Sequence, residues 1–136
     1  MSMISQNIID SYNSMITNHD ASALLLTLDS NNRDVLLLSK ADVNTSYQDI
    51  VAQLPKDDLV FLIVPFNYET HEKPPLKTVK ILLITWIPEA TPVRRKMSGK
   101  MIKGEIQQAF DGLQKDLTVS DFDELDYGVI RKLLIK

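Results

Sequence analysis

Two long apolar runs, LVFLIVPF at residues 59–66 and VKILLITWI at residues 79–87, constrain the fold of this chain more than any other feature. Their content of β-branched and aromatic residues predicts two strands. Neither run alternates regularly between apolar and polar side chains, so we expect both faces of the resulting sheet to be buried. The sequence therefore predicts an α/β fold, a three-layer α/β/α sandwich with helices on both faces of a central sheet.

The first half of the chain predicts a helix, a hairpin and a short helix before these strands. The opening helix is indicated by apolar residues at helical spacing and ends near residues 18–19. These apolar residues are Ile4, Ile8, Ile9, Tyr12, Met15 and Ile16. Strands at 23–28 and 35–38 flank a polar turn, which is typical of a hairpin. The short helix starts at Tyr47 after the hydroxyl cap Thr45-Ser46 and ends at Leu54.

The second half predicts a long helix, a brief strand and a final helix. Residues 67–77 contain Pro74-Pro75 and predict a long exposed hairpin connection. Thr91 is the expected N-cap of a helix from Pro92 to about Asp111. Its buried arc is expected to contain Ile102, Ile106, Ala109, Phe110 and Leu113, with Gly112 just past its end.

After a strand at 117–119, a capping box of Ser120 and Asp123 is expected to open the last helix. The residues of this helix expected to pack inward are Phe122, Leu125, Val129, Ile130, Leu133 and Leu134.

Length, charge and cysteine content limit the class of protein. A chain of 136 residues without repeats or linkers predicts one domain, residues 1–136. Its net charge of −3 gives no overall attraction to nucleic acid. The absence of cysteine fits a reducing compartment, and no targeting segment or membrane span is visible, so we expect a cytoplasmic, non-membrane-spanning protein.

Enzymatic and metal chemistry find little support. His19 and His71 lie far apart in expected loops, so a small cytosolic enzyme is the weakest alternative considered. Residues 99–104 have the glycine spacing of a phosphate loop but are followed by Glu-Ile, where Lys and Ser/Thr are required. The acidic run at 121–126 lacks the glycine and the distal glutamate of a calcium loop. We therefore expect no cofactor, no metal and no catalytic residue.

One basic segment, residues 94–103, stands out in this acidic chain. At helical spacing its polar residues form one stripe beside the apolar arc: Lys96, Lys100, Lys103 and Gln107. Exposed Met97 and Met101 would suit a partner surface because methionine is flexible and polarizable. The pattern fits both a cationic surface for an acidic partner and an ordinary solvated helix face, and spacing alone does not choose between them.

Several motifs resemble the ADF/cofilin family. The segment KILLITWIPEATPVRRKM, residues 80–97, is similar to the family's strand, its Trp-x-Pro-(Asp/Glu) turn and its Pro-Val-Arg-x-Lys-Met helix start. Further similar stretches, in the same order, are Ser46-Tyr47 with Leu54-Pro55-Lys56-Asp57-Asp58, then Phe66-Asn67-Tyr68-Glu69, then Asp121-Phe122-x-Glu124 with Tyr127. The resemblance covers nearly the whole chain after the first helix. It implies the ADF-homology, gelsolin-like architecture, with a mixed sheet of five to six strands.

The resemblance implies an actin-binding protein without covalent chemistry. Such proteins bind actin monomers and filament sides, prefer ADP-bound actin, and sever and depolymerise filaments. The long helix would enter an actin cleft, and the residues expected in this contact are Arg94, Arg95, Lys96, Met97, Lys100, Lys103 and Gln107. A second, filament-specific surface would contain Lys77, Lys80, Lys132 and Lys136. The expected setting is the cytoplasmic actin cytoskeleton, and the expected oligomeric state is a monomer.

Departures from the family pattern define an alternative within the same fold. Ser98-Gly99-Lys100-Met101-Ile102-Lys103-Gly104 keeps only the lysine of the family's Tyr-Ala-Ser-Ser-Lys-Asp, and Gln107-Gln108 replaces a basic pair. The chain is thus also similar to coactosin-like proteins, which bind filament sides without severing. Ser2 is the candidate regulatory phosphosite, and phosphoinositide head groups are a further candidate partner.

Overall fold

The computed structural model describes residues 4–135 and contains one five-stranded sheet. In chain order the strands are β1 (Ala23–Leu28), β2 (Val35–Ala41), β3 (Val60–Glu69), β4 (Lys77–Trp86) and β5 (Lys115–Val119). Their order across the sheet is β2-β1-β3-β4-β5. All neighbours pair antiparallel except β4 and β5, which are parallel. The expected mixed sheet is confirmed, with five strands.

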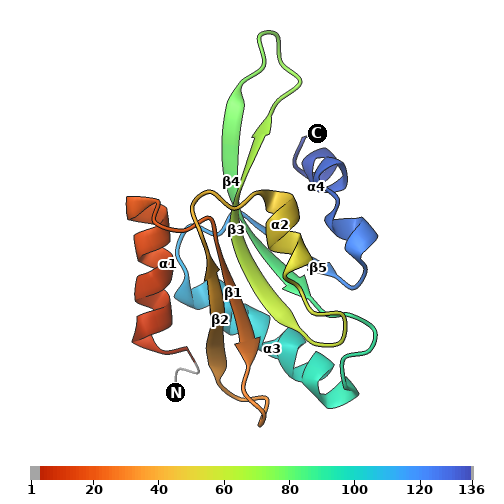
Figure 1. Ribbon diagram of the computed structural model, residues 1–136. Helices are drawn as coiled ribbons and strands as arrows, with labels where there is room; N and C mark the ends of the chain where they lie inside the picture. The colour runs from red at the N-terminus through yellow and green to blue at the C-terminus, as the bar shows by residue number, and fades with distance from the viewer. Residues whose placement is uncertain (1–3, 136) are drawn as a thin grey trace.

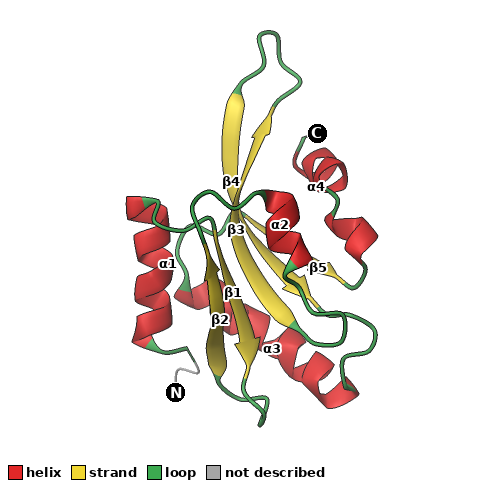
Figure 2. Ribbon diagram, in the orientation of Figure 1, coloured by secondary structure: helices red, strands yellow, loops and turns green. Residues whose placement is uncertain are grey.

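Helices cover both faces of this sheet, which confirms the three-layer sandwich (Figures 1 and 2). On one face lie α1 (Gln6–Asn18) and α3 (Val93–Ala109). On the other lie α2 (Tyr47–Ala52), a 3₁₀ helix η1 (Phe122–Leu125) and α4 (Tyr127–Leu134). Side chains of β1 alternate between the two cores: Leu24 and Leu26 face α1 and α3, whereas Leu25 faces the α2 and α4 layer.

The β3–β4 hairpin is longer than the sequence suggested. The two strands pair without interruption from Val60–Trp86 to Glu69–Lys77, so only residues 70–76 form the connection. β3 pairs with β1 only over Phe61–Ile63, and beyond that point its outer side is a sheet edge. Pro65, which lacks an N–H, is compatible with such an edge. The hairpin therefore extends past the helical layers as a projecting arm (Figure 1).

Two of the predicted caps are wrong. Thr91 does not cap α3, because its N–H donates to the carbonyl oxygen of Pro88 in a turn and Pro92 is the N-cap residue. Its Oγ1 is buried and has no hydrogen-bond partner among residues 4–135. The capping box near the C-terminus begins one residue later than predicted, with Asp121 and Glu124 instead of Ser120 and Asp123.

The predicted last helix is two helices. η1 ends at Leu125, and Asp126, whose extended backbone breaks the helix, caps α4 through the N–H of Gly128. This break changes the orientation of the following residues. Leu125 and Ile130 are buried as expected, but Val129 and Leu133 are 42% and 45% exposed. Phe122, also expected inside, is 37% exposed and packs its ring against Trp86. Within residues 4–135, no helix is long and apolar enough to cross a membrane.

Candidate functional site

The long helix α3 is held on the sheet by one apolar side, as its spacing predicted. Ile102 and Ile106 are buried in the core shared with α1, and Phe110 follows them just beyond the helix. Gly99 lies so close to the strand layer that a Cβ added there would be 3.0 Å from a methyl carbon of Leu59. This close packing fixes which sides of α3 reach the surface.

An apolar stripe runs along the exposed side of α3. Val93, Met97 and Met101 are four residues apart and are 72%, 63% and 78% exposed. Residues at this spacing lie one above the other on a helix. The sequence pointed to Met97 and Met101, but Val93 was missed, although its position one turn before Met97 was the signal. Unpaired apolar side chains in a row are typical of a protein contact.

A cationic edge borders this stripe. Lys100 and Gln107 are exposed, and Lys96 is partly exposed. Lys103 belongs to the same edge, but its ammonium lies 3.1 Å from Asp116 and donates to Thr118 Oγ1 on β5. The structure thus brings the predicted stripe together, with Lys103 partly engaged by the sheet. Arg94 is exposed and, by helical phase, lies on the opposite flank of the apolar stripe.

Arg95, expected in the actin contact, lies mostly beneath the surface, and its guanidinium is engaged within the protein. Its side chain is 12% exposed, and its Nε lies 2.6 Å from Asp58 Oδ1. Its other two nitrogens reach the end of β1 and the β1–β2 turn: Nη1 donates to the Asp29 carbonyl oxygen at 2.8 Å and Nη2 to the Leu28 carbonyl oxygen at 2.7 Å. Nη1 also donates to Asn32 Oδ1 at 2.9 Å. Arg95 therefore ties the start of α3 to the neighbouring turn.

The predicted filament surface is only partly assembled. Lys77 is exposed and borders a hollow of about 600 Å³ that Arg131 of α4 also lines. Arg131 was not predicted, and it donates to the Glu69 carbonyl oxygen, which holds α4 against the hairpin. Lys132 is exposed on α4. Lys80, an odd number of residues from Lys77, points to the other face of the hairpin and is partly buried. Lys136 and Ser2 lie outside the described residues.

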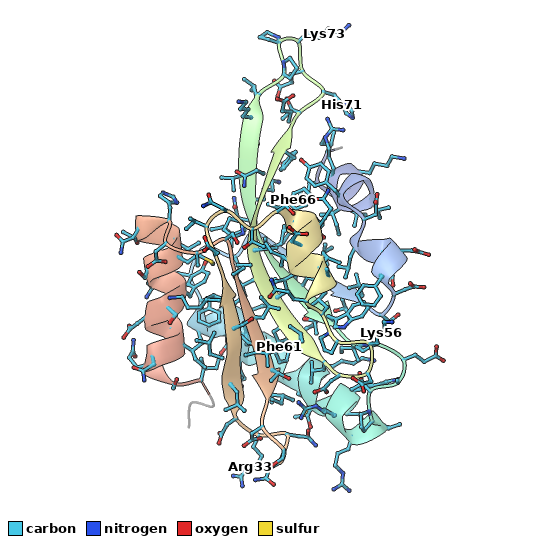
Figure 3. All side chains as sticks on the ribbon, in the orientation of Figure 1. Arg33, Lys56, Phe61, Phe66, His71 and Lys73 are labelled. Carbon is cyan, nitrogen blue, oxygen red and sulfur yellow. The ribbon has the colours of Figure 1, made fainter. Side chains whose placement is uncertain are left out.

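These two surfaces lie at opposite ends of the molecule. Figure 1 shows the β3–β4 hairpin and the end of α4 at the top, and α3 at the bottom. Figure 3 shows the same separation, with His71 and Lys73 at the hairpin tip and Arg33 in the turn at the far end. Because Arg95 joins α3 to that far turn, the helix start and the hairpin tip are separated along the long axis of the protein.

The described residues offer little for metal or acid–base chemistry. Within residues 4–135, no group of three or more His, Asp or Glu side chains is arranged to hold a metal ion. His19 ends α1 and His71 lies in the hairpin connection, both exposed and far apart. Burial, and secondarily the charge of Asp126, raises the pKa of Tyr47, whose hydroxyl donates to the Leu125 carbonyl oxygen. That tyrosine therefore stays protonated and joins α2 to η1.

Comparisons with known proteins show which family the chain resembles in sequence. The family model of cofilin/tropomyosin-type actin-binding proteins matches residues 1–134. Actin-depolymerizing factor 9 of Arabidopsis thaliana is 31% identical over 104 residues, which are 76% of this chain and 72% of that protein.

Solved structures share the fold at lower identity. Streptomyces griseoflavus cofilin superposes with a TM-score of 0.84 at 18% identity, covering 95% of this chain and 93% of that one. Human coactosin-like protein superposes with a TM-score of 0.79 at 20% identity, covering 98% of both chains.

Proposed function

This chain belongs to the family of cofilin/tropomyosin-type actin-binding proteins, and we propose that it binds actin monomers and filament sides and promotes filament severing and depolymerisation. The observation that carries this proposal is the exposed side of α3, where the apolar stripe of Val93, Met97 and Met101 runs beside the cationic edge. Apolar side chains that would otherwise face water can fill a cleft, while lysines at the rim attract an acidic partner.

The two ends of the molecule support a contact with two actin subunits. In this proposal α3 occupies a cleft of one subunit, as Arg94, Lys96, Met97 and Lys100 are all at least partly exposed. The hairpin and α4 then reach the neighbouring subunit along the filament. A contact that requires two adjacent subunits exists only in filaments. It would therefore contribute to the free energy of filament binding and not to that of monomer binding. ADP-bound actin is the proposed preferred state, and the cytoplasmic actin cytoskeleton the proposed setting of a monomeric protein.

A coactosin-like activity, filament-side binding without severing, is the second candidate. The observation that favours it is the exposed pair Gln107 and Gln108, which stands one turn after Lys103 where the family pattern has cations. Each lost charged contact in an interface can cost on the order of 1 to 3 kcal/mol of binding free energy. Weaker binding of α3 would leave the filament decorated but intact.

Imaging of labelled actin filaments separates the two candidates. We expect filaments to shorten and to acquire new internal breaks when the protein is added. Decoration without breaks would support the coactosin-like activity. No change in filaments, together with no co-sedimentation and no binding to ADP-actin monomers, would contradict both.

Two regulators are proposed, phosphoinositides and phosphorylation of Ser2, which lies outside the described residues. Phosphoinositide head groups are anionic, and Lys96 and Lys100 are the cations that would bind them in competition with actin. Phosphorylation of Ser2 would add negative charge at the N-terminus. Vesicles with and without phosphoinositides, tested for inhibition of filament binding, check the first of these proposals.

A further inference from the structure

Ser120 occupies a rigid, exposed connection between β5 and η1. The backbone around it is fixed, because the N–H of Ile87 donates to the Val119 carbonyl oxygen at 2.9 Å and the N–H of Ser120 donates to Glu124 Oε1 at 3.1 Å. Its hydroxyl has no hydrogen-bond partner within the part of the chain that the structure describes. Asp121 supplies the cap expected of Ser120, so this hydroxyl does not cap η1.

The same connection borders the cationic edge of α3. Ser120, Lys96 and Lys100 line one shallow hollow of about 310 Å³. The two lysines are one helical turn apart and so present their side chains on the same side of α3. Glu89 is the one acidic side chain in the wall of this hollow. A group attached to the Ser120 oxygen would therefore lie beside two cations.

The residues after Ser120 provide an acidic recognition sequence. Asp121, Asp123 and Glu124 follow at one, three and four positions, and residues 120–124 are all exposed. The carboxylates of Asp121 and Glu124 accept local backbone N–H groups. Asp123 has no such bond through its carboxylate within the described residues. It is thus free to meet a basic pocket of an enzyme that selects acidic residues on the C-terminal side of a serine.

We propose that Ser120 is a regulatory phosphorylation site whose phosphate pairs with Lys96 and Lys100 and withdraws them from actin. An acid-directed serine kinase would supply the group from ATP. A bond forms between Ser120 Oγ and the γ-phosphorus, the bond from that phosphorus to the bridging β–γ oxygen breaks, ADP leaves, and the hydroxyl proton passes to the kinase base. The inhibitory step rests on the proposed function of the cationic edge, whereas the pairing itself does not.

The negative charge of a phosphate on Ser120 determines that it attracts the two lysines. Phosphoserine carries a charge of about −1.5 to −2 near neutral pH and has three acceptor oxygens. Two lysines in the shared hollow can each donate to it, against repulsion from Glu89 and the nearby carboxylate of Glu124. Glu124 remains held by two backbone N–H groups, so the flexible lysine side chains are the groups that adjust.

The first test measures pairing without actin. The full chain is treated with casein kinase 2 and Mg-ATP, and the modified residue is mapped by mass spectrometry. We expect phosphate at Ser120, and a second phosphate pKa, followed by phosphorus NMR, below its ordinary value of about 6. In the variant Lys96→Gln/Lys100→Gln this pKa should return toward the ordinary value. No phosphate at Ser120, or the same pKa in both proteins, would overturn the proposal.

The second test measures filament co-sedimentation of the phosphorylated and unmodified chains. We expect phosphorylation to weaken binding on the order of tenfold, since it removes two rim cations. Ser120→Ala treated with the same kinase should bind like the unmodified protein, and phosphoserine placed instead at exposed Ser30 in the β1–β2 turn should leave binding unchanged. A lowered phosphate pKa with undiminished binding would refute the inhibitory role. Failure of the unmodified chain to bind actin would refute the proposed function and leave the NMR result to judge the pairing.

Discussion

At the scale of single residues, Arg95 shows how one side chain can orient a functional helix. A guanidinium has five N–H donors, and the contacts of Arg95 with Asp58, the β1–β2 turn and Thr27 engage all three of its nitrogen atoms. By helical phase Arg95 lies with Gly99, Ile102 and Ile106 on the buried side, so its burial was predictable from spacing. Its partners were not, because they lie 37 to 68 residues away in the sequence.

Replacing Arg95 should destabilise the fold. We expect Arg95→Ala to lower the free energy of unfolding by about 2 to 3 kcal/mol. This loss is smaller than that for a fully buried ion pair, because the Asp58 side chain is 40% exposed. Urea denaturation followed by circular dichroism measures this change. Arg94→Ala, at the exposed neighbouring position, is the matched control and should change stability by less than about 0.5 kcal/mol. Equal effects of the two substitutions would show that the buried contacts contribute nothing net.

Asp29, in the turn that Arg95 binds, should give stability a local pH dependence. The N–H of Arg33 donates to its carboxylate, and this bond is the main cause that lowers the pKa of Asp29 below 3.8. Because the folded pKa is below the unfolded one, the stabilisation is present above the unfolded pKa and is lost as pH falls through the folded pKa.

NMR titration of the Asp29 carboxyl should show the lowered pKa directly. The variant Asp29→Asn should lose less stability than the parent as the solution is acidified below pH of about 4, since it has no proton to take up. An ordinary pKa for Asp29 would contradict the role of the turn bonds.

At the scale of elements, the sequence predicted all five strands and the helices α1, α2 and α3, but it merged η1 and α4 into one helix and misplaced several ends. The apolar runs located β3 and β4 because burial on both faces leaves a continuous apolar signature. Their outer ends, residues 67–69 of β3 and 77–78 of β4, were missed, since the ladder continues through polar residues outside the helical layers. The break between η1 and α4 was missed because Asp126 caps α4 by leaving the helical conformation, whereas the apolar spacing continues across it. A pattern of side chains does not report the backbone angles of one capping residue.

Charge reversal on α3 tests the cationic edge as an element. We expect Lys96→Glu/Lys100→Glu to weaken binding to both monomers and filaments at least tenfold by repulsion, with an unchanged melting temperature, since neither side chain enters the core. Lys40→Glu/Lys56→Glu changes the same charge at two exposed lysines outside both surfaces and should bind nearly like the parent. Unaltered binding of the α3 variant would exclude the edge as a contact.

The salt dependence of actin binding distinguishes the contribution of the lysines from that of the apolar stripe. Binding through exposed cations should weaken as the Debye length shrinks below about 10 Å. Binding that is indifferent to salt would instead identify Val93, Met97 and Met101 as the main anchors. Because Lys103 is already paired with Asp116, we expect its removal to change salt dependence less than the removal of Lys100.

At the scale of the whole molecule, the sheet sets the distance between the two surfaces. The packing of α3 and its Arg95 contacts fix one end, and the uninterrupted β3–β4 ladder and the bonds from Arg131 to Glu69 fix the other. A rigid body of this kind can impose its own spacing on two actin subunits. The family and the three layers followed from sequence motifs, but the joining of α4 to the hairpin depends on contacts between segments 62 residues apart and had no signal in spacing.

This separation predicts that reversing charge on the hairpin discriminates filaments from monomers. We expect Lys77→Glu/Lys80→Glu to weaken binding in filament co-sedimentation on the order of tenfold. The affinity for ADP-actin monomers should stay within about twofold of the parent's, because only a filament places a second subunit at the hairpin. The α3 reversal described above is the matched comparison, since a single contact at that end should lower both affinities together. Lys77 is exposed at the projecting end of β4, whereas Lys80 is partly buried on the opposite face, so the single variant Lys77→Glu should carry most of the loss. Equal losses of affinity for monomers and filaments would mean that the two ends act as one surface. If Lys80→Glu alone caused the loss and also lowered the melting temperature, the effect would come from hairpin stability and not from an actin contact.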